Sequence, residues 1–169
     1  MTDEQQRIRG YLIAQAAKLT PAAIVEKIEA ATDQLGAAAV SVPPARWGDR
    51  PEPKEWSGNE VMAHVLAAQA YFGGGILAVL DDSPVPPRPK DQGAEGALLR
   101  TADEWLGLLT KERSAFYQRV LSADANGRLD RTIEHPFFGP LNWRATLLFN
   151  RLHDLDHAEQ LRKIAAALK

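Results

Sequence analysis

Three of the four histidines in this chain are spaced so that one metal ion could bind them all. His153 and His157 lie four residues apart in the segment N-R-L-H-D-L-D-H-A-E-Q-L. Four residues are about one helical turn, so both imidazoles project from the same side of a helix. His64 lies in a second helical segment, W-S-G-N-E-V-M-A-H-V-L. A third imidazole from a neighbouring helix would complete a mononuclear site with three histidine ligands and open positions for water or substrate.

The same spacing fits histidines that are packed or exposed and bind no metal, because H-x-x-x-H is a short motif. The position of His64 argues against this alternative, since it shares an apolar stripe with Val61, Val65 and Phe72. Three imidazoles converging on one core would be costly to bury without a partner. Neutral imidazole suits several divalent ions, so the ligand set leaves Zn, Ni and Fe open.

Two further residues are candidates for catalysis. Glu60 lies one turn before His64 and could orient its ring or act as a general base; alternatively, it caps the helix in a capping box with Ser57. His135 precedes Pro136 in a predicted loop. We expect it to be exposed and mobile at the mouth of the site.

Other polar residues surround the H-x-x-x-H pair. Asp154 and Asp156 could orient the two imidazoles, but aspartates on a helix are usually solvated, and we expect that here. Asn150 and Gln160 flank the inward stripe and could either line a polar pocket or make structural hydrogen bonds.

Several other kinds of site are excluded. A di-iron bundle needs carboxylates from four helices with paired E-x-x-H motifs, and a zincin needs H-E-x-x-H, whereas this chain has H-D-L-D-H. The chain has no cysteine, so it offers no disulfide, thiolate ligand or cysteine nucleophile. Any thiol chemistry must use a thiol from outside.

The spacing of apolar residues and the signals for helix starts predict a short helix over residues 3–18, followed along the chain by four main helices. The main helices begin near Thr20, Ser57, Thr101 and Asn142. The third ends near Ala123. Linkers occupy about 41–55, 82–100 and 125–141, of which the last is irregular or a short hairpin. The linker over 82–100 is long enough for a crossover connection. We therefore predict an all-α four-helix bundle forming one domain over residues 1–169.

Three consecutive glycines, Gly73 to Gly75, weaken the second main helix, which we expect to run to about Leu80. They indicate close packing, a local break or a nearby ligand.

Composition narrows the class of protein. The chain has 169 residues, of which 45% are hydrophobic and 25% charged, with a formal net charge of −2. These values and the lack of a Lys/Arg track argue against nucleic-acid binding. No uninterrupted apolar stretch approaches the roughly 18 residues of a membrane span, and no signal-peptide hydrophobic region is visible. We expect a cytoplasmic protein that does not bind membranes.

Two segments resemble the DinB/YfiT-like superfamily: W-S-G-N-E-V-M-A-H, ending at His64, and H-P-F-F-G-P-L-N-W…H-D-L-D-H-A-E-Q-L, starting at His135. The resemblance covers nearly the whole chain. It implies a four-helix bundle with a crossover between its second and third helices. It also makes His64, His153 and His157 the ligands of one divalent metal.

The resemblance implies two kinds of activity. Some members are thiol-dependent transferases or isomerases that use bacillithiol, mycothiol or glutathione, and others are metal-dependent hydrolases. The leading hypothesis is an enzyme that conjugates a small-molecule thiol with an electrophile in stress or detoxification, with the linkers shaping the electrophile pocket. The alternatives are a metal-dependent hydrolase, a non-catalytic metal- or ligand-binding stress protein and a bundle without metal. A homodimer is also expected.

Overall fold

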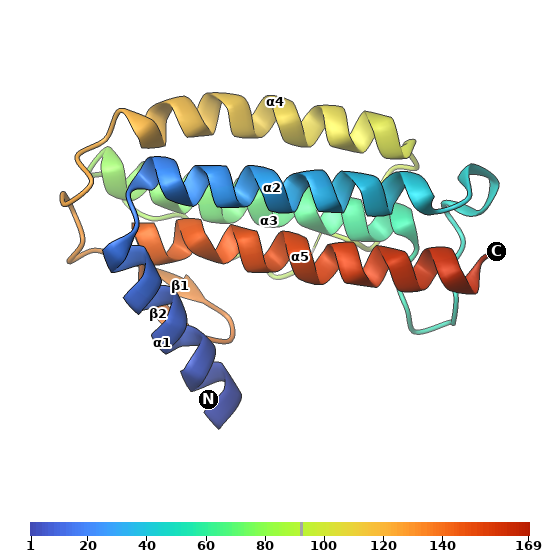
Figure 1. Cartoon of the computed structure of the whole chain (residues 1–169), viewed down its shortest axis with the longest axis horizontal. Helices are drawn as coiled ribbons and strands as arrows, with labels where there is room; N and C mark the ends of the chain where they lie inside the picture. The colour runs from blue at the N-terminus through green and yellow to red at the C-terminus, as the bar shows by residue number, and fades with distance from the viewer. Residues whose placement is uncertain (92) are drawn as a thin grey trace.

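The computed structural model describes residues 1–91 and 93–169. Four long helices lie side by side along the long axis of the molecule (Figure 1): α2 (Pro21–Ser41), α3 (Gly58–Leu80), α4 (Ala102–Leu121) and α5 (Trp143–Ala167). Helices α2 and α5 run in one direction, and α3 and α4 run in the other. Helices α4 and α5 are diagonally opposite, with α2 and α3 between them. The predicted four-helix bundle is confirmed.

The long helices begin at the predicted caps. Thr20, Ser57, Thr101 and Asn142 are the N-caps, and each side chain accepts a hydrogen bond from a backbone N–H in the first turn. These bonds satisfy donors that have no partner inside the helix. Helix α4 ends at Leu121, two residues before the predicted end at Ala123.

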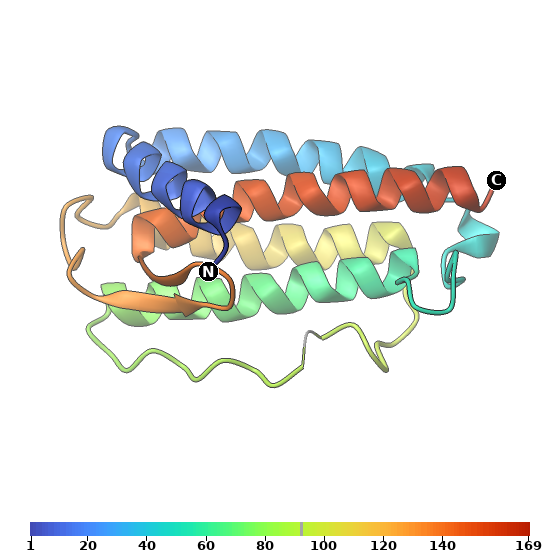
Figure 2. The ribbon, with the colours of Figure 1, turned by 90° about the horizontal axis from the view of Figure 1, so that it is seen from below.

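The linker over 82–100 is the predicted crossover. It leaves the end of α3, runs back along the outside of that helix and enters α4 (Figure 2). This return path is why α3 and α4 are parallel. Residue 92 of the linker lies outside the described residues. The first linker contains one 3-10 turn, Pro44–Arg46.

A short helix and a hairpin close one end of the bundle. Helix α1 (Asp3–Lys18) matches the predicted range. The segment predicted as irregular or a hairpin forms β1 (Thr132–His135) and β2 (Gly139–Asn142), paired antiparallel. Gly139 has φ +65°, which suits a glycine at the end of a tight hairpin loop. Arg9 of α1 donates hydrogen bonds to the carbonyl oxygens of Phe138 and Pro140, so α1 holds the hairpin in place.

The apolar core has two parts. The cluster nearer α1 and the hairpin includes Ile28, Phe72 and Phe116. The cluster nearer the C-terminus includes Leu35 and Leu109. Polar side chains from all four long helices lie between these two clusters.

The three glycines of α3 serve close packing. The helix continues through them without a break. A Cβ on Gly75 would lie 3.1 Å from the Ile133 side chain of β1, and a Cβ on Gly73 would lie 2.8 Å from Gln69 Nε2. Gly74 has nothing within 4 Å of such an atom. Of the three explanations left open by the sequence, close packing accounts for Gly73 and Gly75.

Helix α3 is long and apolar enough to pass a test for a membrane span by length and composition, the one described helix to do so. Thirteen of its residues are buried in the bundle.

Candidate metal centre

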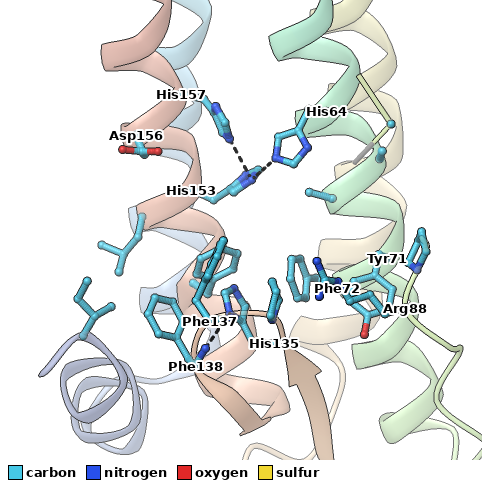
Figure 3. A pocket seen from close by; sticks show the side chains of 18 of the residues that line it. His64, Tyr71, Phe72, Arg88, His135, Phe137, Phe138, His153, Asp156 and His157 are labelled. Carbon is cyan, nitrogen blue, oxygen red and sulfur yellow. Dashed lines mark hydrogen bonds between the residues drawn. The ribbon is translucent and has the colours of Figure 1, made fainter. Parts of the chain in front are cut away.

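The three histidines converge between α3 and α5 (Figure 3). His64 projects from α3, and His153 and His157 project from successive turns of α5. The Nε2 atom of His153 lies 3.1 Å from Nε2 of His64 and 3.1 Å from Nε2 of His157. The ligand atoms of all three lie within 4.8 Å of one another. We call these residues the histidine triad.

The spacing within the triad fits one divalent ion. Metal–nitrogen distances of about 2.0–2.1 Å place neighbouring ligand nitrogens roughly 2.9–3.4 Å apart at ordinary coordination angles. Both contacts of His153, at 3.1 Å, fall in this range. Three Nε2 atoms this close together can direct their lone pairs at one cation.

Gln160 fixes the protonation of one ligand. Nδ1 of His157 lies 2.8 Å from Oε1 of Gln160, so Nδ1–H donates and Nε2 keeps its lone pair for a metal. Hydrogen bonds of this kind orient metal-bound histidines. Of the two roles expected for Gln160, the structure therefore shows a hydrogen bond, made to His157.

Burial keeps the imidazoles of α5 neutral. Desolvation, followed by the nearby rings of His157 and His64, lowers the pKa of His153 well below its usual value. Burial also lowers the pKa of His157. Neutral rings at pH 7 are the form that a metal binds.

The triad lies on the wall of a cavity of about 840 Å³. This volume is within the usual range for small-molecule sites. The aromatic side chains that line it are Tyr11, Trp56, Tyr71, Phe72, Phe137, Phe138 and Phe149. The rings of Trp56 and His157 are stacked, with centroids 6.5 Å apart and an interplanar angle of 21°. The cavity thus offers an apolar volume directly beside the triad.

His135 lines the same cavity, but the prediction that it is exposed is wrong. Its side chain is 4% exposed and is stacked between Phe72 and Phe138. Nδ1 accepts hydrogen bonds from the backbone N–H groups of Phe137 and Phe138, so His135 closes the hairpin loop. Burial lowers its pKa to about 4, which keeps the ring neutral at pH 7. The sequence H-P-F-F-G is typical of a tight turn and could have indicated that His135 closes a hairpin loop.

Glu60 does not line the cavity. Its Oε2 accepts hydrogen bonds from the Ser57 backbone at 2.9 Å and from Nε of Arg50 at 2.9 Å, and Oε1 accepts from Nη2 of Arg50. The hydrogen bond from Arg50 lowers the pKa of the carboxyl. The structure therefore gives Glu60 the capping role and not that of a partner for His64.

The expectation for Asp154 is wrong, and that for Asp156 is confirmed. Asp154 is 0% exposed and forms an ion pair with Arg113 of α4, whereas Asp156 is exposed at the edge of the cavity. Asn150 is buried and does not line the cavity, and its Nδ2 has no hydrogen-bond partner among the described residues.

Arg113 was not singled out from the sequence, although a signal was present. It falls on the inward stripe of α4 between Leu109 and Phe116, at helical spacing. A charged residue on such a stripe predicts a buried ion pair, because burying an unpaired charge is costly.

Comparisons with known proteins agree with this fold. No curated protein matches the chain significantly. The crystal structure of TT2238, a four-helix bundle protein, is 22% identical and superposes with a TM-score of 0.64, covering 85% of this chain and 99% of that one. The sequence model of the DinB superfamily matches residues 27–161, a range that contains the whole histidine triad. The chain belongs to the DinB superfamily.

Proposed function

We propose that this protein is a metal-dependent enzyme that transfers a low-molecular-weight thiol to an apolar electrophile. One observation carries the proposal: three converging imidazoles lie on the wall of a cavity of about 840 Å³ with aromatic sides. The metal-binding part follows from the geometry of the triad. The choice of reaction rests on the resemblance to thiol-dependent members of the DinB superfamily, and the cavity and the composition of the chain are compatible with it.

In this proposal the thiol is a cosubstrate, because the chain contains no cysteine that could supply one. A divalent ion held by the triad would supply Lewis acidity and keep the bound sulfur in its thiolate form at neutral pH. The sulfur would then form a bond to an electrophilic carbon of the second substrate, and the proton of the thiol would pass to solvent. With an aryl halide the leaving group would depart with its bonding electron pair, and with an enone the resulting enolate would take a proton from solvent.

The side chains of the cavity would bind and orient the two reactants. Phe72, Phe138 and Phe149 offer an apolar surface for the body of the electrophile. The ring of Trp56 lies 4.9 Å from that of His64 and 6.5 Å from that of His157, so it would cover one side of a bound metal. Arg7 and Arg88 line the cavity and are exposed, so they would bind anionic groups such as the carboxylates of a small thiol.

Hydrolysis is less well supported than thiol transfer. A hydrolase needs a general acid or base beside the metal, and the two candidates were Glu60 and His135. Glu60 lies outside the cavity and is held by Arg50. The ring of His135 has a pKa of about 4 and uses Nδ1 to close its own loop.

A purely metal-binding protein is also less well supported. Such a site would be expected to be closed, with no cavity beside the metal. Here the triad faces a space that accommodates small molecules. A role in stress or detoxification, a cytoplasmic location and a homodimeric state stay predictions.

The test starts with protein purified without a histidine tag. Elemental analysis should find about one divalent metal per chain in the wild type and none in the His153→Ala/His157→Ala variant. Each protein is then assayed with a panel of thiols (glutathione, bacillithiol and mycothiol) against an aryl halide and an enone. We expect turnover with one thiol class and a loss of at least 100-fold in the double variant.

Two results would contradict the proposal. Metal-loaded wild type that hydrolyses activated esters but conjugates no thiol would point to a hydrolase. Metal-loaded protein with neither activity would point to a binding protein. Glu159→Gln is the matched control, because this residue is exposed on the same helix and lies outside both the cavity and the triad; it should keep both the metal and the activity.

A further inference from the structure

We infer that a buried polar layer across the bundle positions the histidine triad for metal binding. The polar layer contains one side chain from each long helix: Thr32 of α2, Gln69 of α3, Arg113 of α4 and Asp154 of α5. The inference rests on the metal-binding part of the proposed function and is independent of the thiol chemistry.

Arg113 is the centre of the layer. Its Nη1 and Nη2 atoms donate to the two carboxylate oxygens of Asp154, at 2.5 and 2.9 Å. Nη1 also donates to Thr32 Oγ1 at 2.6 Å, and Nε donates to Gln69 Oε1 at 3.0 Å. The side chains of Arg113 and Asp154 are only 5% and 0% exposed. One planar guanidinium therefore ties its own helix to the three others.

The layer joins two helices that are not neighbours in the bundle. Helices α4 and α5 are diagonally opposite, so their backbones make little direct contact. Arg113 crosses this diagonal to reach Asp154. Apolar clusters pack at both ends of the layer and exclude water from it. Among the described residues, this is the direct polar link between α4 and α5.

The layer is linked to the triad through the backbones of α5 and α3. Asp154 follows His153 in α5, and Gln69 lies five residues after His64 in α3. Successive helical residues point about 100° apart, so His153 faces the cavity while Asp154 faces the core. A shift of one residue along α5 would move its side chains by about 1.5 Å and rotate them by about 100°. The 3.1 Å contact between His64 and His153 would not survive such a shift.

A role in positioning explains the layer better than stability does. A buried ion pair adds little net stability over an apolar replacement, because desolvation offsets the attraction of its charges. Its best-attested use is to fix register and pairing. The glycine at position 73 agrees with this role, since a Cβ there would lie 2.8 Å from Gln69 Nε2. The missing side chain of Gly73 therefore leaves room for the Gln69 amide, to which Arg113 donates a hydrogen bond.

The test uses a variant that removes the layer without leaving a buried charge. Arg113→Met/Asp154→Leu replaces the ion pair with apolar side chains of similar size, so the bundle should still fold. Leu109→Ala is the matched control. It lies one turn before Arg113 on α4, is 1% exposed, and removes packing without touching the layer. It should lower stability and leave the triad in place.

Two readouts follow the position of the triad itself. In metal-free protein, an NMR cross-peak between the rings of His64 and His153, whose centroids are 5.1 Å apart, reports their proximity. Competition with a chelating dye reports the affinity for Zn²⁺ or Co²⁺. We expect the double variant to lose the cross-peak and to bind metal at least 10-fold more weakly. The Leu109→Ala variant should keep both within twofold.

Wild-type cross-peak intensity and affinity in a folded double variant would overturn the inference. If the double variant fails to fold, Arg113→Lys gives the same test, because it keeps the charge but loses the Nε bond to Gln69 and the paired bonds to Asp154. Unchanged readouts in that variant would equally overturn it. Because the cross-peak needs neither metal nor thiol, a failure of the proposed function leaves this test decisive.

Discussion

The histidine triad and the polar layer are neighbouring polar clusters in the bundle, but they differ in how their polar groups are paired. In the layer, the Arg113 guanidinium and the Asp154 carboxylate have complementary charges and bond each other directly. In the triad, three like rings meet nitrogen to nitrogen, and burial lowers the pKa of two of them. The layer thus forms its bonds within the protein, whereas the triad presents three nitrogen atoms that could bind one metal ion.

The difference also follows from what surrounds each cluster. The layer is enclosed by two apolar clusters, and neither Arg113 nor Asp154 lines the cavity. The triad has the cavity on one side. A sealed cluster can only hold helices together, while an open one can exchange a ligand. Four predictions test this contrast.

The largest expected effect is the loss of protein stability when the polar layer is broken. Asp154→Ala leaves the charge of Arg113 buried without a partner, so we expect a loss of about 3–5 kcal/mol in the free energy of unfolding. Urea titration at pH 7 measures it. The control is Arg162→Ala, which removes an exposed pair with Glu159 and should cost less than about 0.5 kcal/mol. Equal losses in the two variants would contradict the structural role of the layer.

The next prediction separates the triad from the other buried histidine, His135. Its pKa of about 4 in the folded protein lies below the ordinary 6.5, so the unfolded chain binds the proton more tightly. Stability from this group is complete above pH 6.5 and is lost as the pH falls toward 4. The shift corresponds to about 3 kcal/mol.

His153 and His157 should act in the same direction, because their pKa values are also lowered. His135→Phe should therefore reduce the pH dependence of unfolding, measured on metal-free protein between pH 4 and 7, without abolishing it. An unchanged slope would show that His135 titrates normally. Unlike the triad, His135 should also leave the metal stoichiometry unchanged when it is replaced.

A smaller effect is expected at the hydrogen bond that orients the triad. Gln160→Leu removes the acceptor for Nδ1–H of His157, so we expect metal affinity to fall by about 10- to 100-fold. Isothermal titration with Zn²⁺ or Co²⁺ measures the change. Glu159→Gln, an exposed neighbour on α5, is the control and should bind as wild type does. An affinity within twofold of wild type for Gln160→Leu would remove this residue from the site.

The smallest expected effect is a difference in protein stability between substitutions at two adjacent glycines of α3. Gly74→Ala should stabilise the protein by about 0.5–1 kcal/mol, because its Cβ meets nothing within 4 Å and alanine favours the helix. Gly73→Ala should gain nothing or lose stability, since its Cβ meets the amide of Gln69, which Arg113 holds. Thermal melts followed by circular dichroism measure both. A gain at both positions would show that the layer tolerates movement of Gln69.

Much of the fold could be predicted from local signals. The caps at Ser57 and Thr101, and the proline-rich crossover between α3 and α4, follow from residues within one turn or one linker. The spacing of His153 and His157 also follows from helix geometry alone. What failed were assignments that depend on distant partners: Asp154 was expected in solvent and His135 at an exposed loop. Asp154 is buried against Arg113, which is remote in sequence. The His135 ring is buried by Phe72 of α3 and by Phe138, which the hairpin turn places over it.

The sequence by itself determined the helices, their order and the chemistry of the candidate ligands, because caps, apolar period and residue types act locally. It also determined that any thiol must come from outside, since the chain has no cysteine. Only the tertiary structure decided that His64 of α3 lies 3.1 Å from His153 of α5, and that Arg113 spans the bundle to reach Asp154. Those distances depend on the relative height and rotation of helices, which are set by packing across the whole core and not by any single segment.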